Sequence, residues 1–126
     1  MRDRLTYLFA YGTLRRCSKN KFARVLHAHA EFAGNARMPG RLYWPGSYPG
    51  AVSSHADGEW VRGELYLIYD PRWTLPALDS YEGPEQFERV KLDVQLDLGR
   101  RIEAWVYLYR GAPRGARIPS GDWLRR

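Results

Sequence analysis

Cysteine is nearly absent from this sequence, and long hydrophobic runs are absent altogether. Cys17 is the one cysteine among 126 residues, so no internal disulfide can form, which suits a reducing compartment. The apolar stretch at residues 5–10 is too short for a signal-peptide core or a membrane span. These absences argue against secreted disulfide-rich, membrane-spanning and disordered classes. They predict a single cytoplasmic domain over residues 1–126, long enough to bury a core.

Lysine is also scarce, because 17 of the 20 basic residues are arginines. The formal net charge of +6 is concentrated at the two ends of the chain, with +5 in residues 1–21 and +4 in residues 110–126. The stretch between them carries −3. A nucleic-acid-binding protein usually presents a clustered basic face, so this scattered distribution predicts no nucleic-acid partner.

Metal-ligand patterns are missing as well. His27 and His29 are two residues apart and would point to different faces of a helix, whereas metal-binding pairs on helices are three or four apart. His55 is distant in sequence, and nothing near Cys17 or Ser120 identifies a base for a nucleophile. The sequence therefore predicts no metal site.

Alternating apolar and polar residues predict a protein made mostly of strands. The expected strands are a buried one at 5–10, two short ones within 31–44 broken near Pro39-Gly40, one at 60–69, and a hairpin over 86–109 turning at Gly99-Arg100. The tail at 110–126 has little periodicity. Gly and Pro between these segments favour turns, including a loop at 45–50.

Two short helices are expected between the strands. One runs from a Ser18 cap to about His29, with an apolar face formed by Phe22, Val25, Leu26 and His29. The other spans residues 72–81, with Leu75 and Leu78 facing inward. About six strands and two helices predict an α+β fold in which a mostly antiparallel sheet closes into a small barrel.

Glu82 is an unusual feature of the second helix. It lies at the C-terminal end, where the helix dipole disfavours a carboxylate, just before Gly83. Tyr81 and Phe87 could shield it from water and raise its pKa, as a general base requires. A solvated loop glutamate remains the alternative.

A second unusual feature follows the first strand. The segment Tyr11-Gly12-Thr13-Leu14 comes directly after a buried strand, and a glycine at such a point lets backbone N–H groups face outward as an anion site. An ordinary turn remains the alternative.

Six segments in order resemble the gamma-glutamylcyclotransferase-like family, of the gamma-glutamylamine cyclotransferase type. The match spans about residues 7 to 123, and the six segments are Leu8–Leu14, Tyr48–Val52, Val61–Tyr66, Leu78–Gly83, Glu103–Tyr109 and Ile118–Trp123.

The resemblance implies an enzyme that acts on a small γ-glutamyl amine or amino acid and needs no cofactor. The α-amino group attacks its own γ-carbonyl, which yields 5-oxoproline and a free amine. It also implies that Glu82 is the acid and base. The residues that bind the substrate would be Tyr11, Gly12, Thr13 and Leu14, with Tyr48 and Tyr109 as weaker candidates.

One position departs from the family pattern, since Phe87 stands where relatives often have a tyrosine two residues before an arginine. Glu85 and Glu88 lie close enough in sequence to Glu82 to be mistaken for the base. A non-catalytic domain that binds a small carboxylate is the alternative function. The leaving amine and the oligomeric state are left open.

Overall fold

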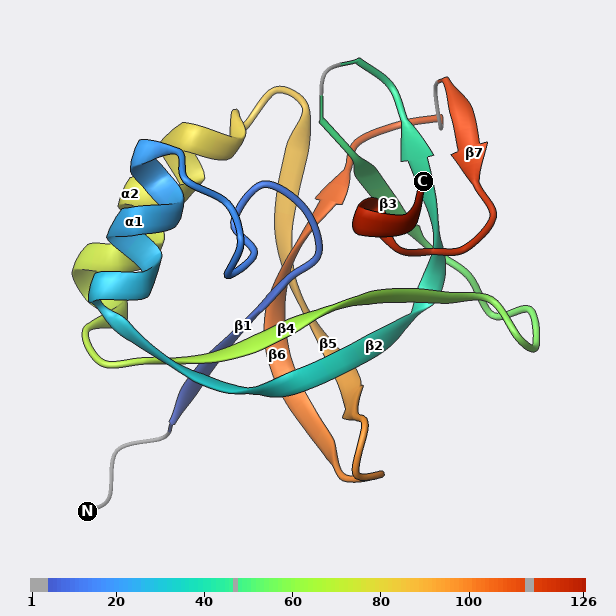
Figure 1. Cartoon of the computed structure of the whole chain (residues 1–126). Helices are drawn as coiled ribbons and strands as arrows, with labels where there is room; N and C mark the ends of the chain where they lie inside the picture. The colour runs from blue at the N-terminus through green and yellow to red at the C-terminus, as the bar shows by residue number, and fades with distance from the viewer. Residues whose placement is uncertain (1–4, 47, 113–114) are drawn as a thin grey trace.

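Strands dominate the computed structural model, which describes residues 5–46, 48–112 and 115–126 (Figure 1). Its elements are β1 (Thr6–Ala10), α1 (Lys21–Ala28), β2 (Ala30–Trp44), β3 (Gly50–Ser53), β4 (Trp60–Ile68), α2 (Pro71–Glu82), β5 (Phe87–Leu96), β6 (Arg101–Tyr109), β7 (Ala116–Ile118) and the short 3-10 helix η1 (Trp123–Arg125). Some residues used in the sequence analysis lie outside the described ones. They are the charged residues Arg2, Asp3, Arg4 and Arg114, and Ser47 of the expected loop.

Five strands close into a barrel in the order β2-β4-β1-β6-β5, because β5 pairs back onto β2 at Ala36 and Arg37. Every neighbouring pair is antiparallel except β1 and β6. The outer strands β3 and β7 both pair with the C-terminal part of β2. The predicted α+β fold with a small, mostly antiparallel barrel is confirmed, with seven described strands rather than six.

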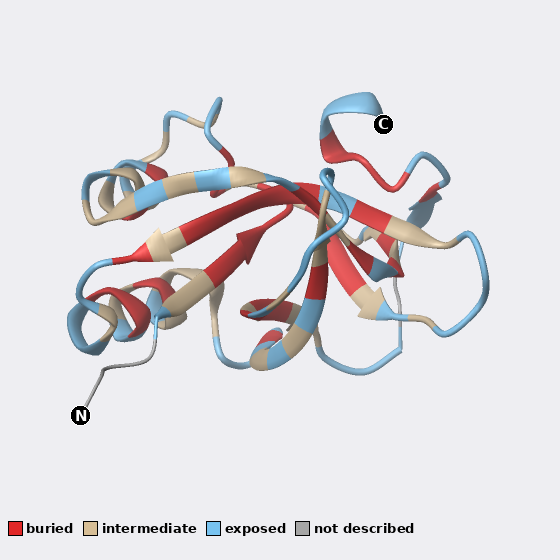
Figure 2. Cartoon of the chain, turned by 90° about the horizontal axis from the view of Figure 1, so that it is seen from below, coloured by how far each residue is buried: buried red, intermediate tan, exposed pale blue. Residues whose placement is uncertain are grey.

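Both faces of β1 are buried, which explains its uninterrupted apolar sequence. Phe9 belongs to a core inside the barrel, and Leu8 belongs to a second core between the barrel and the two helices. Figure 2 shows the buried stretches of the strands and helices in red. Figure 1 shows both helices on one side of the barrel. Because β1 serves both cores, the loop that follows it lies where barrel and helices meet.

The expected break in residues 31–44 is wrong, since β2 is one strand of 15 residues. Proline has no N–H to donate, so it is tolerated only where a ladder bond is not needed. Pro39 pairs with Trp60, the first residue of β4, and β3 takes over as the partner at Gly40. The proline therefore lies where β2 changes partners, and the strand continues through it.

The first helix starts later than expected, because Asn20 rather than Ser18 is its cap. The Asn20 side chain accepts a hydrogen bond of 2.8 Å from the backbone N–H of Ala23.

The tail expected to lack regular structure contains β7 and η1, and Asp122 caps η1 by accepting from the N–H of Leu124 at 3.0 Å. Such short elements leave almost no periodic signal.

A buried ion cluster ties the loop after β1 to the barrel and to the C-terminal segment. The Arg15 guanidinium contacts Glu64 on β4 at 3.3 Å and Asp122 at 2.8 Å, and all three residues are less than 9% exposed. Glu64 also accepts hydrogen bonds from the backbone N–H of Arg16 at 2.5 Å and from the Tyr66 hydroxyl at 2.8 Å. One arginine thus holds three distant parts of the sequence together.

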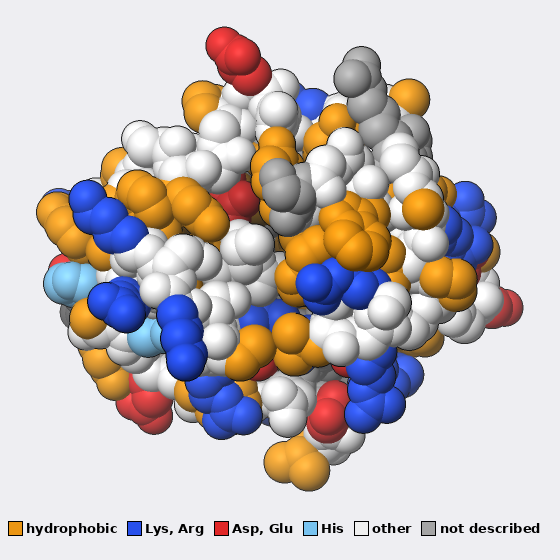
Figure 3. All heavy atoms as spheres, turned by 45° about the horizontal axis from the view of Figure 1, so that its top comes forward, with side chains coloured by type: hydrophobic (Ala, Val, Ile, Leu, Met, Phe, Trp, Pro, Cys, Tyr) orange, Lys and Arg blue, Asp and Glu red, His pale blue; other side chains and the backbone are white. Residues whose placement is uncertain are grey.

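Basic side chains do not gather into one stripe on the face that Figure 3 shows, where Lys and Arg are spread among apolar and uncharged groups. The longest α-helix among the described residues, α2, has 12 residues. No described helix has both the length and the apolar character that crossing a membrane requires.

Replacing Arg15 with methionine should strongly destabilise the protein. The change leaves the Glu64 and Asp122 carboxylates buried without their partner, and breaking a buried pair in this way typically costs about 3–5 kcal/mol. Urea denaturation followed by circular dichroism should show this loss in the free energy of unfolding. The matched control is Arg72→Met at an exposed position of α2, which should change it by less than about 0.5 kcal/mol. Equal stability of the two variants would contradict a central role for the cluster.

Candidate functional site

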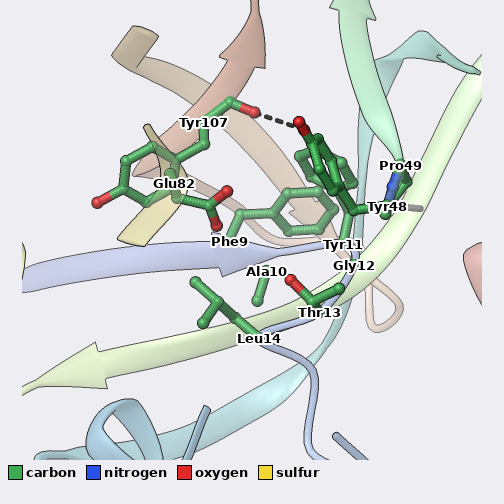
Figure 4. A pocket seen from close by; sticks show the side chains of 10 residues that line it. All are labelled: Phe9, Ala10, Tyr11, Gly12, Thr13, Leu14, Tyr48, Pro49, Glu82 and Tyr107. Carbon is green, nitrogen blue, oxygen red and sulfur yellow. Dashed lines mark hydrogen bonds between the residues drawn. The ribbon is translucent and has the colours of Figure 1, made fainter. Parts of the chain in front are cut away.

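A small pocket of about 20 Å³ opens at the C-terminal end of β1 (Figure 4). Its walls come from the end of β1 and the loop after it, the end of α2, strand β6 and the loop before β3. The lining residues are Phe9, Ala10, Tyr11, Gly12, Thr13, Leu14, Tyr48, Pro49, Glu82 and Tyr107. The fold thus brings together the two segments that the sequence singled out, around residues 11–14 and 82.

Glu82 is the last residue of α2, and its carboxylate faces the β1 end of the pocket (Figure 4). Leu75 and Leu78 bury one face of the helix, which sets the position of its final turn. Gly83 then ends the helix with a φ of 85°, a conformation that glycine adopts without strain. Glu85, by contrast, is exposed and does not line the pocket, and the same holds for Glu88.

Burial raises the pKa of Glu82 from its ordinary value of 4.5 to about 7. The cause is desolvation, because a carboxylate loses favourable hydration when protein surrounds it. A carboxyl group with a pKa near 7 exchanges its proton readily at neutral pH, as a group that both accepts and donates a proton requires. The alternative of a freely solvated glutamate does not describe this position.

Tyr11 forms a rigid wall of the pocket. Its hydroxyl donates to the backbone carbonyl of Tyr107 at 2.6 Å and accepts from the N–H of Ala51 at 3.1 Å. Burial, and then the nearby charge of Glu82, raise its pKa above the ordinary value of 10. Tyr11 therefore stays neutral, and its hydroxyl joins the loop after β1 to β3 and β6.

Gly12 allows the loop after β1 to approach Pro49 closely. A Cβ atom built on Gly12 would lie 2.5 Å from Cγ of Pro49, so any other residue would push these two loops apart. The carbonyl of Gly12 accepts from the N–H of Arg15 at 3.0 Å, which closes a turn. Among the described residues, no hydrogen bond is donated by the N–H groups of Thr13 and Leu14.

Tyr107 is a pocket residue that the sequence analysis did not single out. Its hydroxyl donates to Asp79 at 2.7 Å, and Arg89 binds the same carboxylate through two nitrogens at 2.7 and 3.1 Å. Partial burial acts to raise the pKa of Asp79, but the hydrogen bonds from Arg89 and Tyr107 outweigh it and lower the pKa overall. An ionised Asp79 thus fixes the Tyr107 ring beside Glu82. The alternating pattern of β6 predicts which face of the strand Tyr107 lies on, but it does not indicate that Asp79 is the partner of its hydroxyl.

A wider hollow of about 430 Å³, open to solvent, adjoins the pocket and shares Thr13, Tyr48 and Glu82 with it. The Tyr48 hydroxyl donates to the side-chain oxygen of Gln86. Phe87 lines this hollow, so the hydroxyl missing there would have been close to anything bound in it. The expected site residue Tyr109 lines neither cavity. Its ring instead packs edge-on against the ring of Phe87, with 5.7 Å between the ring centroids.

Among the described residues that line the pocket there is one carboxyl group, and there is no lysine or arginine. In the described part of the chain, no three His, Cys, Asp or Glu side chains come together as metal ligands would. The pocket can therefore receive a cation or amine beside Glu82 and an anion at the N–H groups of Thr13 and Leu14. This pairing suits a zwitterionic amino-acid group.

Comparisons with known proteins identify relatives that are named for gamma-glutamyl cyclotransferase activity. A family model described as "Gamma-glutamyl cyclotransferase, AIG2-like" matches residues 8–125. The chain is 30% identical over 127 residues to "Putative gamma-glutamylcyclotransferase MJ1514" of Methanocaldococcus jannaschii, with 94% of this chain and 96% of that protein covered. It is 28% identical to Gamma-glutamylaminecyclotransferase of Mus musculus, with 82% and 77% covered.

A solved structure supports the fold as well as the family. The crystal structure of an AIG2-like protein from Mus musculus has a TM-score of 0.70 to this chain at 27% identity, covering 88% of this chain and 82% of the other. The family model matches residues 8–125, nearly the same stretch as the six sequence segments that resemble the family. The chain belongs to the AIG2-like gamma-glutamyl cyclotransferase family.

Proposed function

We propose that this protein releases 5-oxoproline and a free amine from a γ-glutamyl amine or γ-glutamyl amino acid. The α-amino nitrogen of the glutamyl unit attacks its own γ-carbonyl carbon and closes a five-membered ring. The bond from that carbon to the leaving nitrogen then breaks. Both reacting groups belong to one molecule, so the main task of the protein is to hold the substrate in the folded, attacking geometry.

The pocket offers a place for each charged group of such a substrate. The N–H groups of Thr13 and Leu14 would bind the α-carboxylate, and the Glu82 carboxylate would bind the α-ammonium group. The leaving amine would then extend into the adjoining hollow beside Tyr48. A hydroxyl or backbone N–H of the same loop would stabilise the oxyanion that develops on the γ-carbonyl.

Glu82 accounts for the protons in both halves of the reaction. An ammonium nitrogen has no free electron pair, so Glu82 first takes one of its protons and generates the nucleophile. The nitrogen loses a second proton after attack, and the leaving nitrogen gains one as its bond to carbon breaks. One carboxyl group beside both nitrogens can relay these protons, provided that its pKa is close to the working pH.

The observation that carries this proposal is the half-buried Glu82 carboxyl group, with its pKa raised to about 7, in the pocket of the Tyr11–Leu14 loop. A domain that only bound a ligand carboxylate would gain nothing from having the Glu82 carboxylate in the same pocket, because two negative charges repel each other. This arrangement therefore supports catalysis over the non-catalytic alternative.

Glu82→Gln should abolish most of the activity, because the amide keeps the shape of the side chain but cannot take a proton. The expected fall in kcat is about 10²–10⁴-fold, the usual contribution of a general acid and base. Chromatographic measurement of 5-oxoproline released from a panel of γ-glutamyl amines provides the test. Glu85→Gln is the matched control and should retain wild-type turnover. Equal turnover by Glu82→Gln and the wild type would remove Glu82 from the mechanism.

The pH dependence of kcat/KM should reflect the same group. Only the ionised carboxylate can accept the proton, so kcat/KM should rise tenfold per pH unit below pH 7 and level off above it. Initial rates between pH 5 and 8.5 would give the midpoint. A midpoint near 4.5, the ordinary glutamate value, would show that burial does not tune this group.

Glu82→Gln should also be more stable than the wild type at neutral pH. The folded-state pKa of about 7 lies above the ordinary 4.5, so between these values the folded chain holds a proton that the unfolded chain has lost. Wild-type stability therefore falls as the pH rises through this window, by about 3 kcal/mol for this group. Glutamine does not titrate, so urea denaturation at pH 4 and pH 8 should show the variant gaining about that much relative to the wild type. A constant difference would argue against a raised pKa.

A further inference from the structure

Asn20 makes two hydrogen bonds that serve different purposes. Its side-chain oxygen caps α1 by accepting from the N–H of Ala23 at 2.8 Å, and its side-chain nitrogen donates to the backbone carbonyl of Thr13 at 2.6 Å. A backbone N–H can only donate and a carbonyl can only accept, so these partners fix the orientation of the amide. Asn20 therefore connects the start of α1 to the pocket loop.

The bond to the Thr13 carbonyl also sets the direction of the next N–H group. A trans peptide unit is planar, so the carbonyl of Thr13 and the N–H of Leu14 point in opposite directions. Asn20 draws the carbonyl toward α1, and this turns the N–H of Leu14 away from α1. Thr13 and Leu14 line the pocket, and Figure 4 shows the Glu82 carboxylate across the pocket from them.

The other carbonyl groups of the loop are also occupied. The Gly12 carbonyl accepts from the N–H of Arg15, and the Leu14 carbonyl lies 3.0 Å from Nε2 of His27 on α1. The carbonyls of residues 12–14 thus all have partners outside the pocket, and the hydrogen bonds of the described residues leave the N–H groups of Thr13 and Leu14 for a ligand.

We propose that Asn20 is a positioning residue for the site that binds the substrate α-carboxylate. It does not touch the substrate, but it holds the peptide between Thr13 and Leu14 so that an N–H group faces the pocket. This inference rests on the proposed function, because the anion concerned is the α-carboxylate of a γ-glutamyl substrate or of 5-oxoproline.

The residue type supports this role. Asn, Asp and Ser cap helices about equally well, so capping alone does not require asparagine. Asparagine differs from the other two because it accepts with one atom and reaches a second backbone group as a donor with the other. Of these three capping residues, only asparagine can cap the helix and also donate a hydrogen bond to the Thr13 carbonyl.

Two substitutions separate the roles, because both keep the cap and remove the donor. Asn20→Asp places a carboxylate oxygen against the Thr13 carbonyl, and Asn20→Ser leaves that carbonyl without a partner and adds no charge. The control is Arg24→Gly, an exposed interior position of α1 that weakens the helix without contacting the loop. Binding of 5-oxoproline and of its uncharged primary amide is measured for each protein by calorimetry, together with kcat, KM and Tm.

The wild type and Arg24→Gly should both prefer 5-oxoproline to its amide, although Arg24→Gly melts at a lower temperature. Both Asn20 variants should reduce that preference by about 10- to 100-fold, the range expected when a hydrogen bond to a charged group is lost. For γ-glutamyl substrates the loss should appear mainly in KM, because the carboxylate is bound in both ground state and transition state.

Two results would overturn the inference. If both Asn20 variants keep the wild-type preference, Asn20 does not position the anion site, and turnover by the wild type leaves the proposed function intact. If Arg24→Gly loses the preference as much as the Asn20 variants do, the effect reflects the stability of α1 alone. A wild type that neither releases 5-oxoproline nor binds it would refute the proposed function and this inference together.

Discussion

The buried contact of Arg15 with Glu64 and Asp122 is the interaction on which the rest of the site depends. It joins the pocket loop to a central barrel strand and to the C-terminal segment, three parts of the chain that share no local structure. A buried guanidinium requires partners with good geometry, because its desolvation is otherwise costly. The cluster therefore restricts the loop to one arrangement, and within that arrangement the neighbouring N–H groups have defined directions.

Glu82 shows how the fold opposes local preference at the candidate site. A carboxylate is disfavoured both at the end of a helix and when it is partly removed from water. The packing of Leu75 and Leu78 in the core between the barrel and helices holds α2 in place against these costs. The raised pKa of Glu82 is thus a consequence of stability supplied elsewhere in the molecule, as is common where chemistry needs an unfavourable environment.

The sequence predicts the elements whose patterns repeat and misses those that depend on distant partners. The hairpin of β5 and β6, the double burial of β1 and the place of Glu82 at the end of a helix follow from local patterns. The choice of Glu82 as the candidate base came from the family resemblance. The continuity of β2 through Pro39 does not, because it depends on which strand pairs with each part of β2. Tyr107 and Asn20 were missed for the same reason, since their roles require knowing which carbonyl or carboxylate lies beside them. Tyr109, in contrast, was expected in the pocket and packs behind Phe87.

No basic side chain is found among the described residues that line the pocket, and this has a consequence for how the proposed site tolerates change. The proposed anion site consists of main-chain N–H groups, so it is encoded by the path of the backbone. Beyond the packing of the buried Leu14 side chain, the turn matters more to this site than the side chains of Thr13 and Leu14. Substitutions there can alter the shape of the pocket and leave its hydrogen-bond donors in place. The residues that cannot change freely are those that bend and hold the turn, among them Gly12, which has no room for a side chain beside Pro49. In the proposed site, recognition of the ligand and tolerance to sequence change are thus separated within a single loop.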